Sequence, residues 1–379
     1  MRTLLLLWLF VAPGMDTLQV MFWNVENFFD WRNDSTTVSD VEFSAAGERH
    51  WTWKRFQAKA NAFAKALFWV EAETGRLPDI VGLEEVENAF VLRQVLQKTA
   101  LRKLDYKYVH YDSPDRRGID VALLYRSSRL EFLDSKPCHL FAADTVMATR
   151  DILLCVFRRV GPPVMPDSPS SVIPGLTGNL LEERDSPIRV GHDNVFAVLV
   201  NHHPSKYGGA AGSEPRRRIA VERLRFLADS LAAIGIDRII AGGDFNDTPD
   251  NPVFRLLEPA LLPLHLDPFH RGLGTIKYDG KWDLIDHIYV SPALVAVPKS
   301  ASASDSSSGE VDQQTEKSGE KSSASAQMQI LRIPFLLTRD TVHSGEKPLR
   351  TYTGPRHTGG VSDHLPVLLE VGISIENNQ

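Results

Sequence analysis

The sequence has very little cysteine: only Cys138 and Cys155 occur among its 379 residues. Two cysteines are too few for a disulfide framework, and alone they cannot build a zinc site. In an oxidising compartment they could pair with each other, and otherwise they are two half-buried thiols. A small scaffold held together by disulfides is therefore excluded, while both states of these two thiols stay open.

The chain also lacks an excess of positive charge. It has 42 Lys and Arg against 48 Asp and Glu, which gives a net charge of −6 at pH 7. This balance argues against a strongly basic nucleic-acid binder, although it leaves room for a local basic groove. The charged fraction of 24% and the hydrophobic fraction of 43% are typical of a globular domain, so collagen and wholesale disorder are excluded.

No hydrophobic run is long enough to span a bilayer. The stretch from Leu4 to Ala12 follows one positive charge and has the length of a secretory h-region. Ala12 and Gly14 form a small-x-small pair, so residues 1–14 are expected to be a signal peptide of an exported protein, periplasmic or extracellular. The alternative is a buried N-terminal strand, because another strand-like run starts at Leu18.

Two segments lack the apolar residues that a core requires. Residues 160–193 are rich in proline, and residues 298–327 contain no aromatic residue. Neither segment can bury enough surface to offset its ordering entropy, so we expect two loops inserted between neighbouring strands. The rest of 15–372 is then one domain of about 300 residues, followed by a tail at 373–379.

Elsewhere, short apolar runs alternate with amphipathic segments, which indicates an α/β protein with helices covering the sheet faces. Helical spacing occurs at Trp53–Glu73, Ala89–Thr99 and Arg216–Ile234. Several of the strand candidates are apolar throughout, as a sheet covered on both faces requires. The strand candidates are Leu18–Trp23, Ile80–Leu83, Val121–Tyr125, Asp151–Phe157, Val195–Val200, Arg238–Ala241, Leu284–Val290, Ile330–Leu337 and Val367–Val371.

Polar and ionisable residues collect at the carboxyl ends of these runs, where α/β proteins form their sites. A Ser-centred G-x-S-x-G elbow, a phosphate-binding P-loop and an H-E-x-x-H zinc helix are all absent from the sequence. The oxygen ligands at the strand ends suit a hard cation, Mg²⁺ or Mn²⁺, with Ca²⁺ possible. With His202 and His364 as donors or bases, they predict metal-assisted attack of water on a phosphate ester.

Seven motifs in a fixed order carry a family resemblance. The chain resembles the endonuclease/exonuclease/phosphatase superfamily, with the deoxyribonuclease I-like fold, and within it a bacterial secreted type. The resemblance covers residues 18–372 apart from the two inserts, and it implies a four-layer α/β/β/α sandwich of two packed mixed β-sheets. The motifs are FWNVEN (22–27), GLEEVEN (82–88), RGIDVALLYR (117–126), VNHHPSKYGG (200–209), GGDFND (242–247), IDHIYVS (285–291) and SDHLPV (362–367).

The resemblance implies a metal shell. Glu85 would be the principal Mg²⁺ ligand, Asn24 would belong to the same shell, and Asp363 would be a second metal contact. Glu26 ranks lower, because only some members of the family have an acidic residue there. Glu84 stands where relatives usually have Gln, and its extra negative charge is expected to strengthen cation binding.

The resemblance also implies the catalytic groups. His202 would contact the phosphate or act as an acid, and Asp244 and Asn246 would orient the attacking water and hold the phosphate. His364 would be the general base or a transition-state stabiliser, oriented by Asp286. Such a carboxylate fixes the imidazole tautomer and raises its basicity.

Basic residues after the N-H-H-P-S motif could bind phosphate oxygens. Lys206 and Arg217 are the predicted contacts, together with the neighbouring Arg216 and Arg218. The alternative is that the three arginines form the solvated start of a helix. His203 is expected to fill a position where relatives have a large side chain.

We therefore expect a Mg²⁺-dependent phosphoester hydrolase, an endonuclease or phosphodiesterase acting on nucleic acid as a monomer without a stable membrane span. The alternative is a phosphatase or a phospholipid phosphodiesterase of the sphingomyelinase or inositol-phosphatase kind, because one fold supports all of them. An inactive binding module would have lost catalytic positions, and all of those named above are present. No basic and aromatic platform for single strands and no membrane-docking hairpin stands out.

Overall fold

The computed structural model of the chain describes residues 17–33, 37–160, 194–206, 209–295 and 326–373. The predicted signal peptide, the tail after residue 373 and nearly all of both predicted inserts lie outside these residues. Among the described helices none is long and apolar enough to cross a membrane.

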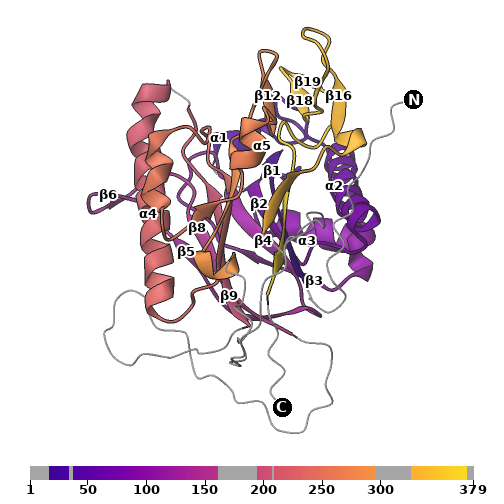
Figure 1. Cartoon of the computed structure of the whole chain (residues 1–379). Coiled ribbons are helices and arrows are strands. Elements are labelled where there is room, and N and C mark those ends of the chain that lie inside the picture. The colour runs from indigo at the N-terminus through magenta and orange to yellow at the C-terminus, as the bar shows by residue number, and fades with distance from the viewer. Residues whose placement is uncertain (1–16, 34–36, 161–193, 207–208, 296–325, 374–379) are drawn as a thin grey trace, which may run out of the picture.

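Two six-stranded sheets lie face to face at the centre of the molecule (Figure 1). Both sheets are mixed, because each has one parallel pair of neighbouring strands among antiparallel ones. Sheet A has the order β15 (Gln327–Ile330), β20 (Val367–Gly372), β1 (Thr17–Phe28), β2 (Ile80–Val86), β4 (Asp120–Arg126) and β3 (Tyr106–His110). Sheet B has the order β11 (Leu262–Pro263), β14 (Asp286–Val290), β10 (Ile239–Asp244), β9 (Val195–His202), β8 (Ile152–Arg159) and β5 (Leu130–Cys138).

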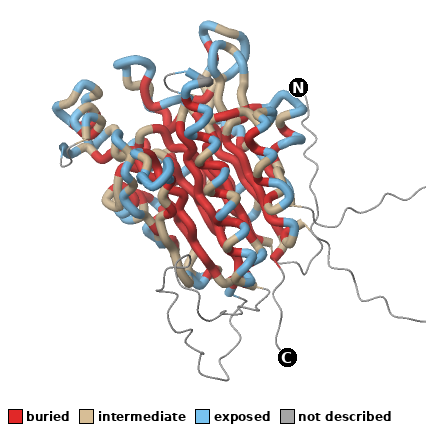
Figure 2. Tube along the Cα trace, turned by 90° about the vertical axis from the view of Figure 1, so that its left-hand side faces the viewer, coloured by how far each residue is buried: buried red, intermediate tan, exposed pale blue. Residues whose placement is uncertain are grey.

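Helices cover the outer face of each sheet. The helices α2 (Trp53–Thr74) and α3 (Ala89–Lys98) pack on sheet A, and α4 (Ala210–Ala233) packs on sheet B (Figure 1). Three hydrophobic clusters fill the three interfaces between the layers: helices on sheet A, sheet A on sheet B, and sheet B on α4. Figure 2 shows that the buried residues lie mainly on the central strands. The four-layer α/β/β/α sandwich is therefore confirmed.

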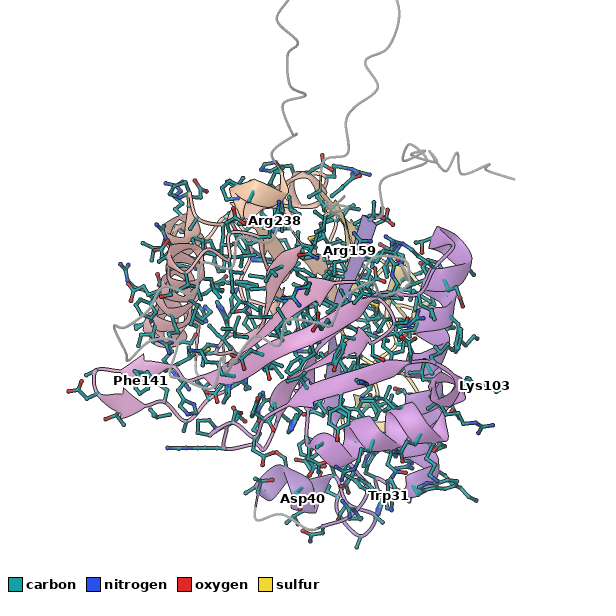
Figure 3. The ribbon with its side chains drawn as sticks, turned by 90° about the horizontal axis from the view of Figure 1, so that it is seen from below. Trp31, Asp40, Lys103, Phe141, Arg159 and Arg238 are labelled. Carbon is teal, nitrogen blue, oxygen red and sulfur yellow. The ribbon has the colours of Figure 1, made fainter. Side chains whose placement is uncertain are left out.

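Shorter elements complete the chain. The hairpins β12–β13, β16–β17 and β18–β19 gather with α1 and α5 at one end of the sheets, and Phe141 projects on the separate hairpin β6–β7 (Figures 1 and 3). These elements are α1 (Val38–Glu42), η1 (Ala100–Lys103), β6 (Phe141–Ala142), β7 (Thr145–Val146), η2 (Pro252–Leu257), α5 (Leu266–His270), β12 (Ile276–Tyr278), β13 (Lys281–Asp283), η3 (Pro292–Leu294), η4 (Pro334–Leu336), β16 (Leu337–Arg339), β17 (Glu346–Pro348), β18 (Tyr352–Thr353) and β19 (Arg356–His357).

Strand β1 shows why the central runs are apolar at every position. Met21 and Trp23 point into the cluster under α2, whereas Val20 and Phe22 point into the cluster between the sheets. Successive side chains of a strand alternate between the two faces, so a strand covered on both faces needs apolar residues throughout. The sequence pattern predicted this two-sided burial correctly.

The spacing between the sheets depends on one aromatic ring. Phe22 lies between Gly82 of sheet A and Gly242 of sheet B. A Cβ atom on Gly82 would lie 2.5 Å from the Phe22 ring, and one on Gly242 would lie 2.4 Å from it. Only glycine leaves room for this ring, so the pair lets the two sheets approach closely.

Three predicted boundaries were wrong. The second insert ends before residue 326, because Gln327 begins β15 and pairs with Glu370. The predicted strand Ile330–Leu337 is instead the end of β15 followed by the turn η4, which starts at Pro334. Helix α4 begins at residue 210, and Pro215, which resembles a helix start in the sequence, lies inside the helix.

The two cysteines are free thiols. Cys138 of β5 is buried in the cluster under α4, and Cys155 of β8 is buried in the cluster between the sheets. The two side chains therefore point to opposite faces of sheet B, whereas a disulfide needs Cβ atoms that face each other. The alternative of two unpaired thiols is correct, although both are fully buried and not half-buried as expected.

Replacing Gly242 by Ala is expected to destabilise the protein by about 1–3 kcal/mol, because the new methyl group would collide with the Phe22 ring between the sheets. Urea unfolding followed by circular dichroism measures the change. Gly212→Ala in α4 is the matched control: its Cβ would meet no atom within 4 Å, so stability should rise slightly. A Gly242→Ala protein as stable as the wild type would show that the ring does not set the spacing.

Candidate active site

Strand ends from both sheets meet at one end of the sandwich. Strands β1 and β2 run parallel in sheet A and pair Asn24 with Glu84, so Glu85 follows directly. In sheet B, Asp244 at the end of β10 pairs with His202 of β9 and with Asp286 of β14. The side chain of Asn24 donates to Asp244 Oδ2 at 3.0 Å, which joins the two sheets in a single site.

The carboxylate of Asp244 lies at the centre of this site. Its Oδ1 accepts the backbone N–H of Asn246 at 2.8 Å, and its Oδ2 lies 3.6 Å from Nε2 of His202 and 3.9 Å from Nε2 of His364. Burial, above all, raises the pKa of Asp244 to about 7, and Asp286 adds to the rise. The group thus faces two imidazoles and an amide at once.

His364 and Asp286 form the predicted pair. Nδ1 of His364 lies 2.9 and 3.1 Å from the two carboxylate oxygens of Asp286. Burial alone would lower the pKa of His364, but the carboxylates of Asp286 and Asp244 raise it well above the ordinary value. The two carboxylates thus favour the protonated imidazole, which is the form that a transition-state stabiliser requires and a general base does not.

The two histidines of the N-H-H-P-S motif, His202 and His203, have lowered pKa values, which favours their neutral forms. Burial, followed by the nearby charges of Arg150 and Arg117, holds the pKa of His202 well below its ordinary value. Burial, followed by the nearby charges of Arg150 and Arg217, lowers the pKa of His203 to about 3. The His203 ring packs on Phe245 with 4.4 Å between ring centroids, so it fills space as expected.

The side-chain amide of Asn246 is used within the protein. Its Nδ2 donates to the backbone carbonyl of His203 at 3.0 Å, and Arg150 donates to the same carbonyl at 2.6 Å. Asn246 also supplies its backbone N–H to Asp244. In this arrangement Asn246 holds the two strand ends together and orients the central carboxylate.

Glu85 and Asn24 offer the oxygen ligands that a hard cation prefers. Oε2 of Glu85 accepts the backbone N–H of Asn27 at 2.8 Å, while its Oε1 lies 3.7 Å from Arg117 and 3.9 Å from His202, both beyond hydrogen-bond distance. Oδ1 of Asn24 accepts the N–H of Glu26 at 2.9 Å. Among the described residues Oε1 of Glu85 accepts no hydrogen bond, and a carboxylate oxygen of this kind, together with the amide oxygen of Asn24, suits Mg²⁺, Mn²⁺ or Ca²⁺.

Strained backbone conformations are concentrated at the candidate active site. Four of the seven non-glycine residues described with a positive φ belong to the site: Glu26, Asn27, Glu85 and Asn246, at 46°, 49°, 64° and 53°. Such conformations cost free energy and persist only where the surrounding structure imposes them. Glu26, Asn27 and Glu85 lie at register shifts near the carboxyl ends of β1 and β2, and Asn246 follows β10, so the strand ends that form the site are held in these conformations.

Glu84 does not add the charge expected of it. Neither of its carboxyl oxygens has a hydrogen-bond partner among the described residues, and both are buried. Burial, followed by the repulsion of Asp286 and Asp244, raises the pKa of Glu84 well above its ordinary value. The raised pKa favours the protonated, neutral form of this side chain in the absence of a cation, and the effect of Glu84 on cation binding stays a prediction.

The predicted phosphate contacts instead hold Asp247. Lys206 Nζ lies 2.8 Å from one carboxylate oxygen of Asp247, and Arg217 Nη2 lies 3.0 Å from the other. Arg217 is only 1% exposed, so the structure does not support contact between this side chain and a substrate. Its neighbours Arg216 and Arg218 are exposed on α4, as the alternative of a solvated helix face predicted.

Three arginines that the sequence analysis did not assign lie around the acidic groups. Arg117 is 43% exposed, with Nη2 at 3.7 Å from Glu85, and the buried Arg150 pairs with Asp115 at 3.2 Å. Arg350 is bound to Asp363 at 3.0 Å. Arg117 stands in the motif RGIDVALLYR, which was a usable signal, whereas nothing in the sequence marks Arg150 or Arg350.

Two further features lie outside this constellation. His110, Asp112 and Asp120 could hold a metal ion, but the oxygens of Asp120 already face His110 Nε2 at 3.1 Å and the Ser113 hydroxyl at 2.5 Å. A surface cavity of about 550 Å³ beside α3 and β3, which Leu101 and Tyr108 help to line, contains none of the predicted site residues.

A sequence model of the Endonuclease/Exonuclease/phosphatase family matches residues 19–159 and 183–372. The matched segments contain every predicted catalytic and metal-ligating residue, and they omit residues 160–182 of the first predicted insert. No curated protein sequence matches the chain significantly.

Solved structures of similar arrangement have low sequence identity. An endonuclease/exonuclease/phosphatase family protein from Bacteroides thetaiotaomicron is 14% identical, with a TM-score of 0.49 and coverage of 95% of this chain and 99% of the other. The mannosyl-6-phosphatase of the same organism is 14% identical (TM-score 0.47, coverage 93% and 99%). TDP2 of D. rerio, complexed with single strand DNA product, is also 14% identical (TM-score 0.47, coverage 94% and 99%).

Replacing Asp286 by Asn is expected to lower the pKa of His364 by about 1 to 3, because the imidazolium loses its adjacent negative charge. Titration of ¹⁵N-labelled histidines by NMR measures this pKa, and a His364→Gln sample assigns the signal. Asp229→Asn in α4, where the carboxylate is 54% exposed and paired with Arg225, is the control. An unchanged pKa in Asp286→Asn would contradict the pairing.

Proposed function

The chain belongs to the endonuclease/exonuclease/phosphatase family, and we propose that it hydrolyses the phosphodiester bonds of nucleic acids with the help of a divalent cation. The observation that carries the proposal is the Asp244 carboxylate, which faces Asn24, His202 and His364 where the two sheets end. The open carboxylate oxygen of Glu85 belongs to the same cluster. Phosphoester hydrolysis is the activity of the family, and the choice of nucleic acid as the substrate is the part that we add.

The residues divide the chemistry among them. A divalent cation at Glu85 and Asn24 would supply positive charge for the phosphate oxygens. Asp244 is held at one oxygen by Asn246 and at the other by Asn24, so its free lone pairs can orient a water molecule and accept its proton. Positioning of this kind, before any change in charge, is a large part of phosphoryl-transfer catalysis.

The two histidines reach the phosphate from different sheets: His202 ends β9 of sheet B, and His364 lies just before β20 of sheet A. His364 is cationic because of Asp286, so its Nε2–H can donate to charge that develops on phosphate oxygens. His202 is neutral and buried, with Nε2 directed toward Asp244 and Glu85. It can donate one hydrogen bond without adding charge, which suits a phosphate contact better than an acid.

Nucleic acid is favoured by the cations at the edge of the site. Arg117 and Arg350 are 43% and 48% exposed; Arg350 is bound to Asp363 at 3.0 Å, and Arg117 lies 3.7 Å from Glu85. Guanidinium groups bind phosphate oxygens with two parallel hydrogen bonds, and a nucleic acid brings a phosphate at every nucleotide. A substrate with several phosphates would use both arginines at once.

A phospholipid phosphodiesterase is the second candidate, because two hairpins beside the site carry exposed apolar side chains. Tyr278 of β12 and Val342 in the turn between β16 and β17 are each 78% exposed. The two hairpins are joined by Lys277 and Asp340 at 3.2 Å. No local pattern in the sequence marks this pair of hairpins, because the two segments are more than 60 residues apart in the chain.

Export stays a prediction, since residues 1–14 lie outside the described residues. The prediction of a monomer is likewise untested.

Asp244→Asn and His364→Ala are each expected to lower kcat by about 10²- to 10⁴-fold, because each removes a group that moves or stabilises charge at the phosphate. EDTA should silence the wild type. Asp229→Asn is the control, and circular dichroism checks that the variants are folded. Hydrolysis that survives either substitution and also EDTA would refute this mechanism.

The assay itself separates the candidate substrates. Plasmid DNA, RNA, sphingomyelin, inositol phosphates and a bis-aryl phosphodiester are compared with Mg²⁺, Mn²⁺ and Ca²⁺. Faster cleavage of DNA or RNA supports the proposal, and preference for sphingomyelin vesicles supports the second candidate.

Arg117→Gln is expected to raise KM for an oligonucleotide about tenfold, equivalent to about 1.4 kcal/mol, because one charge-assisted hydrogen bond to phosphate is lost. Arg218→Gln on α4, 59% exposed and paired with Glu222, is the control with the same change of charge. Lys206→Gln tests the phosphate contact predicted from the sequence. A larger rise of KM in Lys206→Gln than in Arg117→Gln would show that Lys206, and not Arg117, binds the phosphate.

A further inference from the structure

Arg350, in the loop between β17 and β18, bridges two carboxylates of the site. Its Nη2 lies 2.9 Å from Oε1 of Glu26 and 3.0 Å from Oδ2 of Asp363, and its Nε lies 3.0 Å from the same Glu26 oxygen. Asp363 was predicted as a second metal contact and Glu26 as a lower-ranked acidic residue. Both carboxylates are thus bound to a protein cation.

The anchor of this bridge is built into the core. Oε2 of Glu26 accepts the backbone N–H of Thr351 at 2.8 Å, and the side chain of Glu26 is only 6% exposed. Lys59 of α2 is buried beneath it and donates to the Glu26 backbone carbonyl and to the Thr351 hydroxyl. Each oxygen of Glu26 therefore already has a partner, and the loop that carries Arg350 is tied to β1 and to α2.

A second divalent cation would need the oxygens that Arg350 holds. In two-metal sites both ions are bound by carboxylates and lie about 3.5–4 Å apart. Beside Glu85 and Asn24, the carboxylates at this edge of the site are Glu26 and Asp363, and one guanidinium bridges both. An arginine keeps its charge at every physiological pH, so this positive charge is permanent.

We propose that the chain binds one catalytic cation, at Glu85 and Asn24, and that the guanidinium of Arg350 takes the place of a second cation between Glu26 and Asp363. This inference rests on the proposed function, because the single cation is the one that the proposed hydrolysis requires. Arg350 is 48% exposed, and its Nη1 has no acceptor among the described residues. This nitrogen can donate to a phosphate oxygen, as a second metal ion would bind it.

The test is the number of Mn²⁺ ions that the full chain binds without substrate, measured by isothermal titration calorimetry and by the electron paramagnetic resonance signal of free Mn²⁺. The wild type should bind one ion, and Glu85→Gln should lose it. Arg350→Met should bind two, since the pair of carboxylates is released, and Arg350→Lys should keep one. Two ions on the wild type, or one on a folded Arg350→Met protein, would overturn the inference.

Asp363→Asn gives an independent measurement that does not depend on the folding of the Arg350 variants. If Arg350 occupies Asp363, removal of that charge changes the affinity of the single ion by less than fivefold. A loss of fivefold or more would make Asp363 a ligand and overturn the inference. Asp112→Asn is the control for the separate group at His110 and Asp120, and loss of the ion in this variant would also contradict the assignment.

These outcomes separate the inference from the proposed function. A chain that cleaves phosphodiesters but binds two ions refutes the role of Arg350 alone. A chain that binds one ion, with the expected variants, but cleaves no substrate of the panel refutes the proposed function alone. A wild type that binds no Mn²⁺ refutes both.

Discussion

The site depends on one hydrogen bond between the two sheets, from the amide of Asn24 to the carboxylate of Asp244 at 3.0 Å. The donor lies near the carboxyl end of β1 in sheet A and the acceptor ends β10 in sheet B, so the bond forms only at one spacing of the sheets. Phe22, two residues before Asn24, sets that spacing by filling the gap between Gly82 and Gly242. Packing of an apolar ring thereby positions two polar groups for chemistry.

Burial of several carboxylates at one point explains most of the other features. A buried negative charge is costly unless it is protonated or paired. Glu84 has no hydrogen-bond partner among the described residues, and its raised pKa favours the protonated form; Asp286 is paired with His364, and Glu26 is paired with Arg350. The net charge of −6 describes the whole chain and says little about this balance of local charges.

Much of the fold and site could be predicted, because the relevant residues are neighbours in the sequence. The apolar runs gave the central strands, and Glu85 and Asp244 lie at or directly after the ends of such runs. Strand β15 was missed because it is short and its exposed face is polar, with Gln327 and Gln329. The role of Arg217 was wrong, because a charge run in a sequence does not tell which of its members turns inward.

The sequence by itself determined the alternation of strands and helices, the family, and the polar residues that end the strands, since each of these is a local pattern along the chain. Only the tertiary structure decided which charges meet. Arg350 is 324 residues from Glu26 in sequence but 2.9 Å away in space, and Arg117 reaches Glu85 from another loop. Such pairs depend on how two sheets and their loops pack, and electrostatic interactions act across space, so no spacing within the sequence records them.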